Sequence, residues 1–276
     1  MRLTIFHDTV YLYETPARYC IQYLRLTPRA DAGQRIVEWD IESPGVRWRQ
    51  TDAFGNVVYV MSLDAAHQTL RIRARGVVET SLRPGDAIAD VESVPVESFL
   101  VPTPLTRPDA AMLDMARVVT AADDKDAALD SLMRDIHARV RYETGATDVE
   151  HTAAEALALG RGVCQDHAHI FIACARAAGL PARYVSGYID AGDASHVSSH
   201  AWADVWLAGR GWVSFDATHT VHAGEAYCRL AVGRDFLDAS PVRGMRRGGT
   251  GELLSVNVAV NASSASPAAS QSGVQQ

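Results

Sequence analysis

The residue with the clearest chemical potential is Cys164, within Gly162-Val163-Cys164-Gln165-Asp166-His167. The pattern places this cysteine in the first turn of a predicted helix, where free backbone N–H groups and the positive end of the helix dipole converge. Both favour a thiolate over a thiol, so we expect the pKa of Cys164 to lie below ~8.5. The same N–H groups can stabilise an oxyanion when a carbonyl is attacked, and Gly162 lets a substrate approach.

A thiolate nucleophile needs a base and a group that orients the base. His200 opens the strand-like run Ser199-His200-Ala201-Trp202, and Asp216 ends the run Gly211-Trp212-Val213-Ser214-Phe215-Asp216. The short turn at 208–210 predicts that these strands are antiparallel neighbours, which brings His200 near Asp216. Taken singly, His200 is equally typical of a core histidine and Asp216 of a turn cap.

Three blocks of sequence together resemble the transglutaminase-like superfamily of cysteine enzymes: 160–168, 199–202 and 211–216. More narrowly, the chain resembles bacterial transglutaminase-like proteins that are described as cysteine proteases and carry a β-rich N-terminal region. The resemblance implies a papain-like α+β core with Cys164 as nucleophile, His200 as base and Asp216 as orienting acid. Ala217 stands where the family commonly has proline, which should change the stiffness of the turn more than its chemistry.

The reaction stays open at this point. Attack of Cys164 on an amide carbonyl would leave a thioester, which water resolves in a peptidase or amidase and an amine resolves in a transglutaminase. We favour hydrolysis slightly, because no additional acceptor-binding domain is evident, and we expect a peptide or protein amide as substrate. Tyr142 and Gln165 are candidates for a further oxyanion donor, although Tyr142 also fits a core position and Gln165 a solvated one.

Two other classes of function are alternatives. A catalytically silent transglutaminase-like binding or scaffold protein would not require Cys164, His200 and Asp216 together. A zinc hydrolase is suggested by histidines in C-x-x-H and H-x-x-H spacing, but no second cysteine pair completes a site. We therefore expect no metal and no cofactor, and we interpret the remaining histidines mostly as rim or surface groups; these are His167, His169, His196, His219 and His222.

The elements that must position these residues follow from hydrophobic periodicity. Residues 1–105 alternate with period two, as in 70–75, which predicts an antiparallel all-β, sandwich-like N-terminal region. A proline-rich connector follows at 101–108, and the catalytic core is expected over 106–260.

Helical stripes occur at 112–119 and 129–140, and Thr152 and Glu155 have the spacing of a capping box that opens a short helix. A further helix is expected from Cys164 to Gly179, with an apolar stripe over 168–175. Strands are expected at 182–189, 200–207, 211–216 and 253–260, and the low-complexity tail 261–276 is expected to be disordered. The fold class is thus α+β.

Composition limits the remaining possibilities. The chain has 276 residues and a net charge of −7, so binding to nucleic-acid phosphates is not expected. No apolar run is long enough to span a membrane, and no secretory signal is evident, so we expect a cytoplasmic protein without a membrane partner. The four cysteines are widely spaced, which argues against a disulfide framework; they are Cys20, Cys164, Cys174 and Cys228. Nothing in the sequence indicates the oligomeric state.

Overall fold

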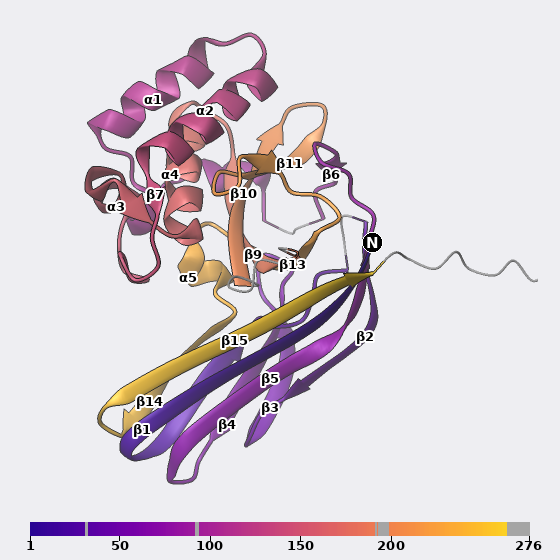
Figure 1. Cartoon of the computed structure of the whole chain (residues 1–276), viewed down its shortest axis with the longest axis vertical. Coiled ribbons are helices and arrows are strands. Elements are labelled where there is room, and N and C mark those ends of the chain that lie inside the picture. The colour runs from indigo at the N-terminus through magenta and orange to yellow at the C-terminus, as the bar shows by residue number, and fades with distance from the viewer. Residues whose placement is uncertain (31–32, 92–93, 191, 193–198, 264–276) are drawn as a thin grey trace, which may run out of the picture.

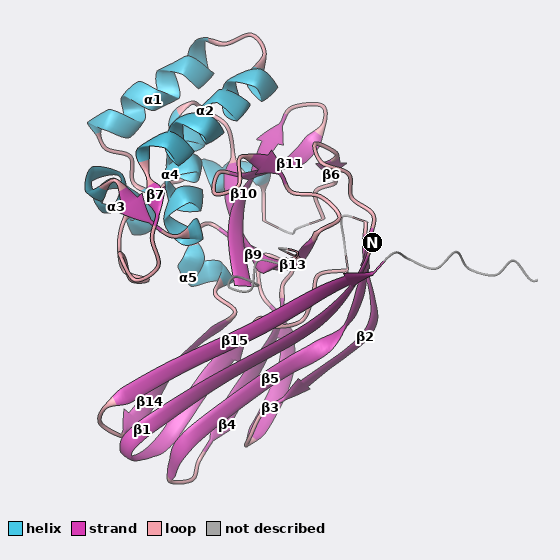
Figure 2. Ribbon diagram, in the orientation of Figure 1, coloured by secondary structure: helices cyan, strands magenta, loops and turns pink. Residues whose placement is uncertain are grey.

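The computed structural model of the chain describes residues 1–30, 33–91, 94–190, 192 and 199–263. It has two regions, a long curled β-sheet and an α+β region in which helices cover one face of a second sheet (Figure 1). The helices gather on one side of the second sheet, and the long strands of the first sheet extend away from it (Figure 2). This is the α+β architecture that the sequence predicted.

The N-terminal sheet is antiparallel and its central order is β2-β5-β1-β4-β3. Its strands are β1 (Arg2–Leu24), β2 (Gln34–Glu42), β3 (Val46–Thr51), β4 (Val57–Leu63) and β5 (His67–Thr80). Alternation decides which face is inside: Leu70 and Ile72 are fully buried, whereas Arg71 lies on the outer face. Register shifts in β1 between Leu12 and Tyr19 mark where the sheet curls around its own core.

Two strands from the end of the chain complete this sheet. β14 (Val242–Gly248) and β15 (Glu252–Ser263) both pair antiparallel with β1. The sequence placed residues 242–260 with the catalytic core and 261–276 in a tail, so the structure differs at both boundaries. The reason is that β1 is 23 residues long and offers a second edge, against which Val258 and Val260 of β15 pack on the core. Residues 264–276 lie outside the described residues.

The structure contains the four predicted helices, and α3 and α4 begin at the predicted residues. The elements are η1 (Val96–Leu100), η2 (Pro104–Thr106), α1 (Ala110–Ala121), α2 (Lys125–Arg139), α3 (Ala153–Leu159), α4 (Cys164–Ala177) and α5 (Phe236–Ala239). Asp109 and Asp124 cap α1 and α2 by accepting a backbone N–H. Thr152 and Glu155 form the expected capping box of α3. No helix among the described residues is long and apolar enough to cross a membrane.

Helix α4 lies at the centre of the α+β region. The sequence predicted one apolar stripe, but every residue from Gln165 to Arg176 is buried. This difference arises because α1, α2 and α3 pack around α4 on the sides that strand β10 (Ser199–Leu207) does not cover. Gly179 follows the helix with φ +80°, the left-handed conformation that favours glycine.

The second sheet is also antiparallel, with the order β12-β11-β10-β9-β13. Besides β10 it contains β9 (Ala182–Ile189), β11 (Gly211–Asp216), β12 (Val221–His222), β13 (Tyr227–Gly233) and, on β11, β6 (Ala87–Ile88). Strands β10 and β11 are antiparallel neighbours, as predicted. A separate parallel pair, β7 (Arg141–Tyr142) and β8 (Arg161–Gly162), leads directly into α4.

Buried hydrogen bonds join the two regions. Asn56, which is fully buried, donates to the Val232 carbonyl at 2.7 Å and accepts from the Val232 N–H at 2.9 Å. Gln34 makes the same kind of double contact with the backbone of Arg229. Strand β13, at the edge of the second sheet, is therefore held against residues of the N-terminal region.

Candidate functional site

Cys164 is the first residue of α4, and its position is set by Asp166. The Asp166 carboxylate accepts from the Val163 N–H at 2.7 Å and from the Thr147 hydroxyl at 2.6 Å. Gly162 makes room for this carboxylate, because a Cβ there would lie 2.5 Å from Asp166 Oδ2. The start of the helix is thus anchored directly beside the thiol.

Cys164 also differs from the other cysteines in exposure. It is half-buried, whereas Cys20, Cys174 and Cys228 are buried, and all four are free thiols. Burial raises the pKa of Cys174 to about 12 and raises the pKa of Cys228 as well. Only Cys164 of these four therefore combines access with the start of a helix.

His200 and Asp216 lie side by side on the adjacent strands β10 and β11. His200 Nε2 donates to Asp216 Oδ2 at 2.7 Å, and both side chains are buried. The other ring nitrogen, Nδ1, is buried without a hydrogen-bond partner of its own among the described residues, which leaves it for the Cys164 thiol. Burial alone would lower the pKa of His200, but Asp216 and Cys164 together raise it to about 10.

Asp216 is the most heavily hydrogen-bonded group of the site. Its Oδ2 accepts from His200, His219 Nδ1 and the Tyr227 hydroxyl, each at 2.7 Å. Its Oδ1 accepts from the backbone N–H groups of Thr218 at 2.9 Å and His219 at 3.2 Å. Although burial opposes it, the bonds from His200 and His219 hold the pKa of Asp216 well below its usual range.

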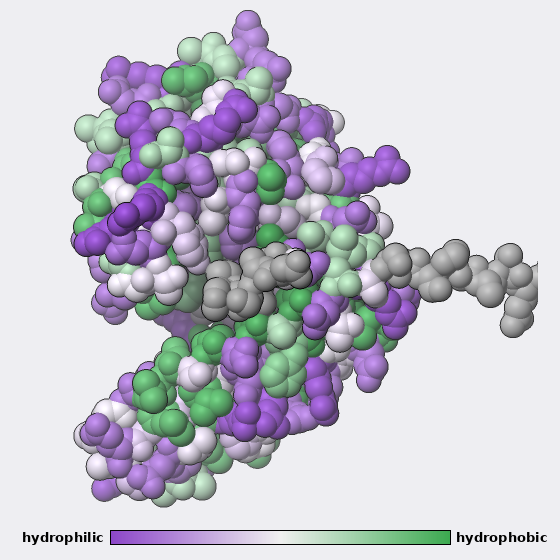
Figure 3. All heavy atoms as spheres, viewed as in Figure 1, coloured by the Kyte–Doolittle hydropathy of each residue, from purple (hydrophilic) through white to green (hydrophobic). Residues whose placement is uncertain are grey.

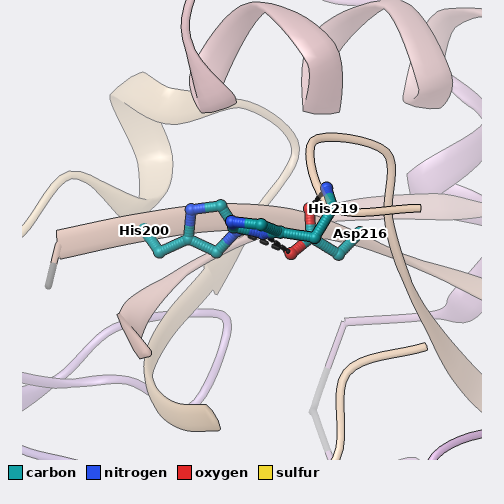
Figure 4. A group of neighbouring side chains, drawn as sticks. All are labelled: His200, Asp216 and His219. Carbon is teal, nitrogen blue, oxygen red and sulfur yellow. Dashed lines mark hydrogen bonds and ion pairs between the residues drawn. The ribbon is translucent and has the colours of Figure 1, made fainter. Parts of the chain in front are cut away.

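Figure 4 shows the two imidazoles of His200 and His219 meeting at the Asp216 carboxylate. The sequence placed His219 among the rim histidines, and Tyr227 was missed because β13 was not predicted. The Asp-x-x-His spacing of 216 and 219, just after a strand, is the signal that could have revealed the first contact. Nothing comparable in the sequence marks Tyr227, because its contact depends on the pairing of β13 with β9.

The same three side chains have the composition of a metal site. The ligand atoms of His200, Asp216 and His219 lie within 4.8 Å of one another. Both imidazoles, however, are engaged in hydrogen bonds to a single oxygen, Asp216 Oδ2. These hydrogen bonds account for the convergence without an ion.

The histidine pairs that suggested zinc are not brought together. His167, three residues after Cys164, uses its ring nitrogens on the Thr218 hydroxyl and the Val140 carbonyl, at 3.0 and 2.9 Å. His219 contacts Asp216, whereas His222 contacts Asp130 at 2.9 Å.

The prediction that these histidines lie mostly at the rim or surface is wrong for His167 and His169. Both are buried: His167 lies against the Val140 carbonyl and the Thr218 hydroxyl, and the ring of His169 packs on Tyr184 of β9. His169 accepts from the Phe236 N–H at 3.1 Å, and burial lowers its pKa to about 3. His196 lies outside the described residues.

The two proposed oxyanion donors differ in their surroundings. Tyr142 pairs with Gly162 across β7 and β8, remains partly exposed, and has a pKa raised by burial and by the charge of Cys164. Gln165 is buried and its amide contacts the Val149 carbonyl at 3.4 Å. Tyr142 therefore has the more accessible polar group, and both assignments stay predictions.

The fold and the site define a two-region α+β protein with a helix-start cysteine facing a His-Asp pair, and comparisons with known proteins identify its family. The profile of the transglutaminase-like superfamily matches residues 114–217, and that of the bacterial transglutaminase-like N-terminal region matches residues 3–79. An uncharacterized protein of Mycobacterium leprae is 33% identical over 263 residues, covering 90% of this chain and 94% of its own. The chain belongs to the transglutaminase-like superfamily, as the sequence blocks indicated.

Other proteins are similar to this chain over most of their length. An uncharacterized protein of Mycobacterium tuberculosis H37Rv is 29% identical, covering 88% of this chain and 87% of its own. Among solved structures, a candidate cysteine protease from Cytophaga hutchinsonii superposes with a TM-score of 0.76, covering 97% of this chain and 93% of its own. That structure is 20% identical to this chain, so the likeness concerns the fold.

Proposed function

We propose that the protein is a cysteine-dependent amide-bond enzyme in which Cys164, His200 and Asp216 act as a catalytic triad. The observation that carries this proposal is the buried His200–Asp216 hydrogen bond of 2.7 Å, with the second ring nitrogen left for the accessible thiol. A buried, charged pair is costly to maintain without a compensating role. The superfamily to which the chain belongs typically uses cysteine-based catalysis.

The first step of the proposed reaction is transfer of an acyl group from the amide to the Cys164 sulfur. The Cys164 thiolate forms a bond to the carbonyl carbon of an amide, and His200 Nδ1 gives its proton to the leaving nitrogen as the C–N bond breaks. Asp216 stabilises the imidazolium while that proton is present. The backbone N–H groups at the start of α4 face the position where the oxyanion develops.

A thioester on Cys164 is then resolved by water or by an amine. Hydrolysis of peptide or protein amides is our first choice, because the described residues form the curled β-sheet and the α+β region, without a third folded unit that could bind an acceptor. Transfer to an amine, as in a transglutaminase, is the second outcome of the same chemistry.

Mass spectrometry of a peptide library incubated with the protein and a labelled primary amine tests this proposal. Chain cleavage identifies a peptidase, a one-dalton gain at glutamine identifies deamidation, and amine incorporation identifies transfer. The Cys164→Ala variant should abolish every product, whereas Cys174→Ala, in the same helix, should retain them. Products that persist in Cys164→Ala would overturn the proposal, and the absence of any product with the unmodified chain would favour a silent scaffold.

A further inference from the structure

We infer that His219 is a positioning residue of this site. It holds the Asp216 carboxylate in place, so that His200 stays protonated and stays oriented toward Cys164. The inference rests on the proposed function and extends it by one residue. His219 contacts both oxygens of the carboxylate, through its Nδ1 at 2.7 Å and its backbone N–H at 3.2 Å.

The geometry shows how this double contact would act. With five donors on two oxygens, the lone pairs of Asp216 are filled from β10, β13 and its own turn, so the carboxylate cannot rotate away from His200. Each donor also lowers the proton affinity of the carboxylate. Asp216 therefore stays ionised, and the shared proton stays on His200.

The position of His219 is not explained by packing. Its side chain is 44% exposed, yet it points back toward Asp216, with its ring centroid 4.9 Å from that of His200 (Figure 4). The next residue, Thr220, has φ +57°, and it is the only non-glycine residue with positive φ in the described part of the chain. Such backbone strain persists where surrounding interactions hold it, as the two bonds of His219 do here.

The rate at which iodoacetamide alkylates Cys164 at a fixed neutral pH tests this role without knowledge of the substrate. His219→Ala removes the side-chain donor, and we expect alkylation about tenfold slower, the effect of losing one hydrogen bond to a charged group. His219→Asn places an amide N–H where Nδ1 was, so the rate should stay within about threefold of the unmodified chain. Recovery of the alkylation rate in His219→Asn would show that the side chain at 219 acts as a hydrogen-bond donor and does not merely support the structure.

Two further variants complete the experiment. His222→Asn makes the same change three residues away, where the imidazole contacts Asp130, and should leave the rate unchanged. Tyr227→Phe removes another donor from the same oxygen and should slow alkylation several-fold, which tests the role of these donors even if His219→Ala fails to fold. Thermal unfolding of each variant verifies that it is folded.

The outcomes distinguish the inference from the function on which it rests. A rate in His219→Ala equal to that of the unmodified chain, or a rate in His219→Asn as low as in His219→Ala, would overturn the role of His219. Cys164 alkylated no faster than Cys20 or Cys228 in the unmodified chain would instead overturn the proposed function, and the role of His219 with it.

Discussion

At the scale of single residues, the site depends on a buried charge pair whose components stabilise each other. Asp216 and Cys164 raise the pKa of His200 to about 10, whereas His200 and His219 lower that of Asp216. A buried charge without its partner would be strongly destabilising. The pair therefore contributes to folding as well as to the proposed chemistry.

This coupling predicts how stability depends on pH. Below the ordinary pKa of histidine, near 6.5, the folded and unfolded chains both hold the His200 proton, and the contribution of the pair is complete. As the pH rises toward 10, the unfolded chain loses the proton first, so the contribution is lost. Asp216 acts in the opposite direction, since its lowered pKa gives stability above about pH 4 that is lost as the pH falls.

Urea unfolding of the unmodified chain and of His200→Gln, compared at several pH values, measures this contribution. The difference in unfolding free energy should shrink between pH 6.5 and 10 by at least about 1.4 kcal/mol, the equivalent of one pKa unit. A difference that grows with pH over this range would contradict the assignment of a protonated His200.

At the scale of elements, the reactivity of Cys164 depends on how α4 begins. The Asp166 carboxylate is buried and ties the turn before the helix to Thr147 and to the Val163 N–H. It is also an acidic group in the first helical turn, where the dipole favours negative charge. Such a contact fixes the direction in which the first residue of the helix projects.

We predict that Asp166→Ala lowers the free energy of unfolding by about 1–3 kcal/mol, because a buried cap and its hydrogen bonds are lost. Alkylation of Cys164 should also slow, since the helix start is no longer anchored. Glu155→Ala removes the equivalent acidic group from the capping box of α3, where it is exposed, and should lower the free energy of unfolding less than Asp166→Ala does, with no change at Cys164. Equal effects of the two substitutions on alkylation would argue against a special role for Asp166.

At the scale of the whole molecule, the two regions share a buried polar joint. Asn56 bonds to both backbone groups of Val232 on β13, and Tyr188 of β9 bonds to His7 of β1 at 2.9 Å. Burial lowers the pKa of His7 to about 4, so this ring is neutral in the joint.

An apolar patch also lies on the curled sheet (Figure 3), where Leu253, Leu254 and Val256 of β15 are exposed.

The joint predicts that the two regions unfold together. Asn56→Ala leaves both backbone groups of Val232 without their partner, so it should lower the unfolding free energy by about 2–4 kcal/mol. Gln50→Ala, on the exposed strand β3, should change it by about 0.5 kcal/mol or less. Both variants should retain one cooperative transition by circular dichroism and tryptophan fluorescence; two separate transitions would show that the regions fold independently.

Much of the architecture could be predicted from local sequence alone. Period-two alternation and turn residues predicted the antiparallel N-terminal sheet, and the capping box and the helix-start pattern predicted the starts of α3 and α4, because each signal acts over a few neighbouring residues. The pairing of β10 with β11 followed from a short turn, and it brought His200 to Asp216 as predicted. The roles of Cys164, His200 and Asp216 stay proposals.

Features that depend on contacts between distant segments of the chain were evident only from the tertiary structure. It placed β14 and β15 against β1, more than 200 residues away in the sequence. This pairing could not be predicted, because the residues of a strand do not indicate which distant strand will pair with its free edge. It buried His167 against Val140 and Thr218, and His169 against Tyr184 and Phe236. It also placed Tyr227, on β13, within hydrogen-bond distance of Asp216. The donors to a buried carboxylate come from several distant segments, so they can be identified only in the folded chain.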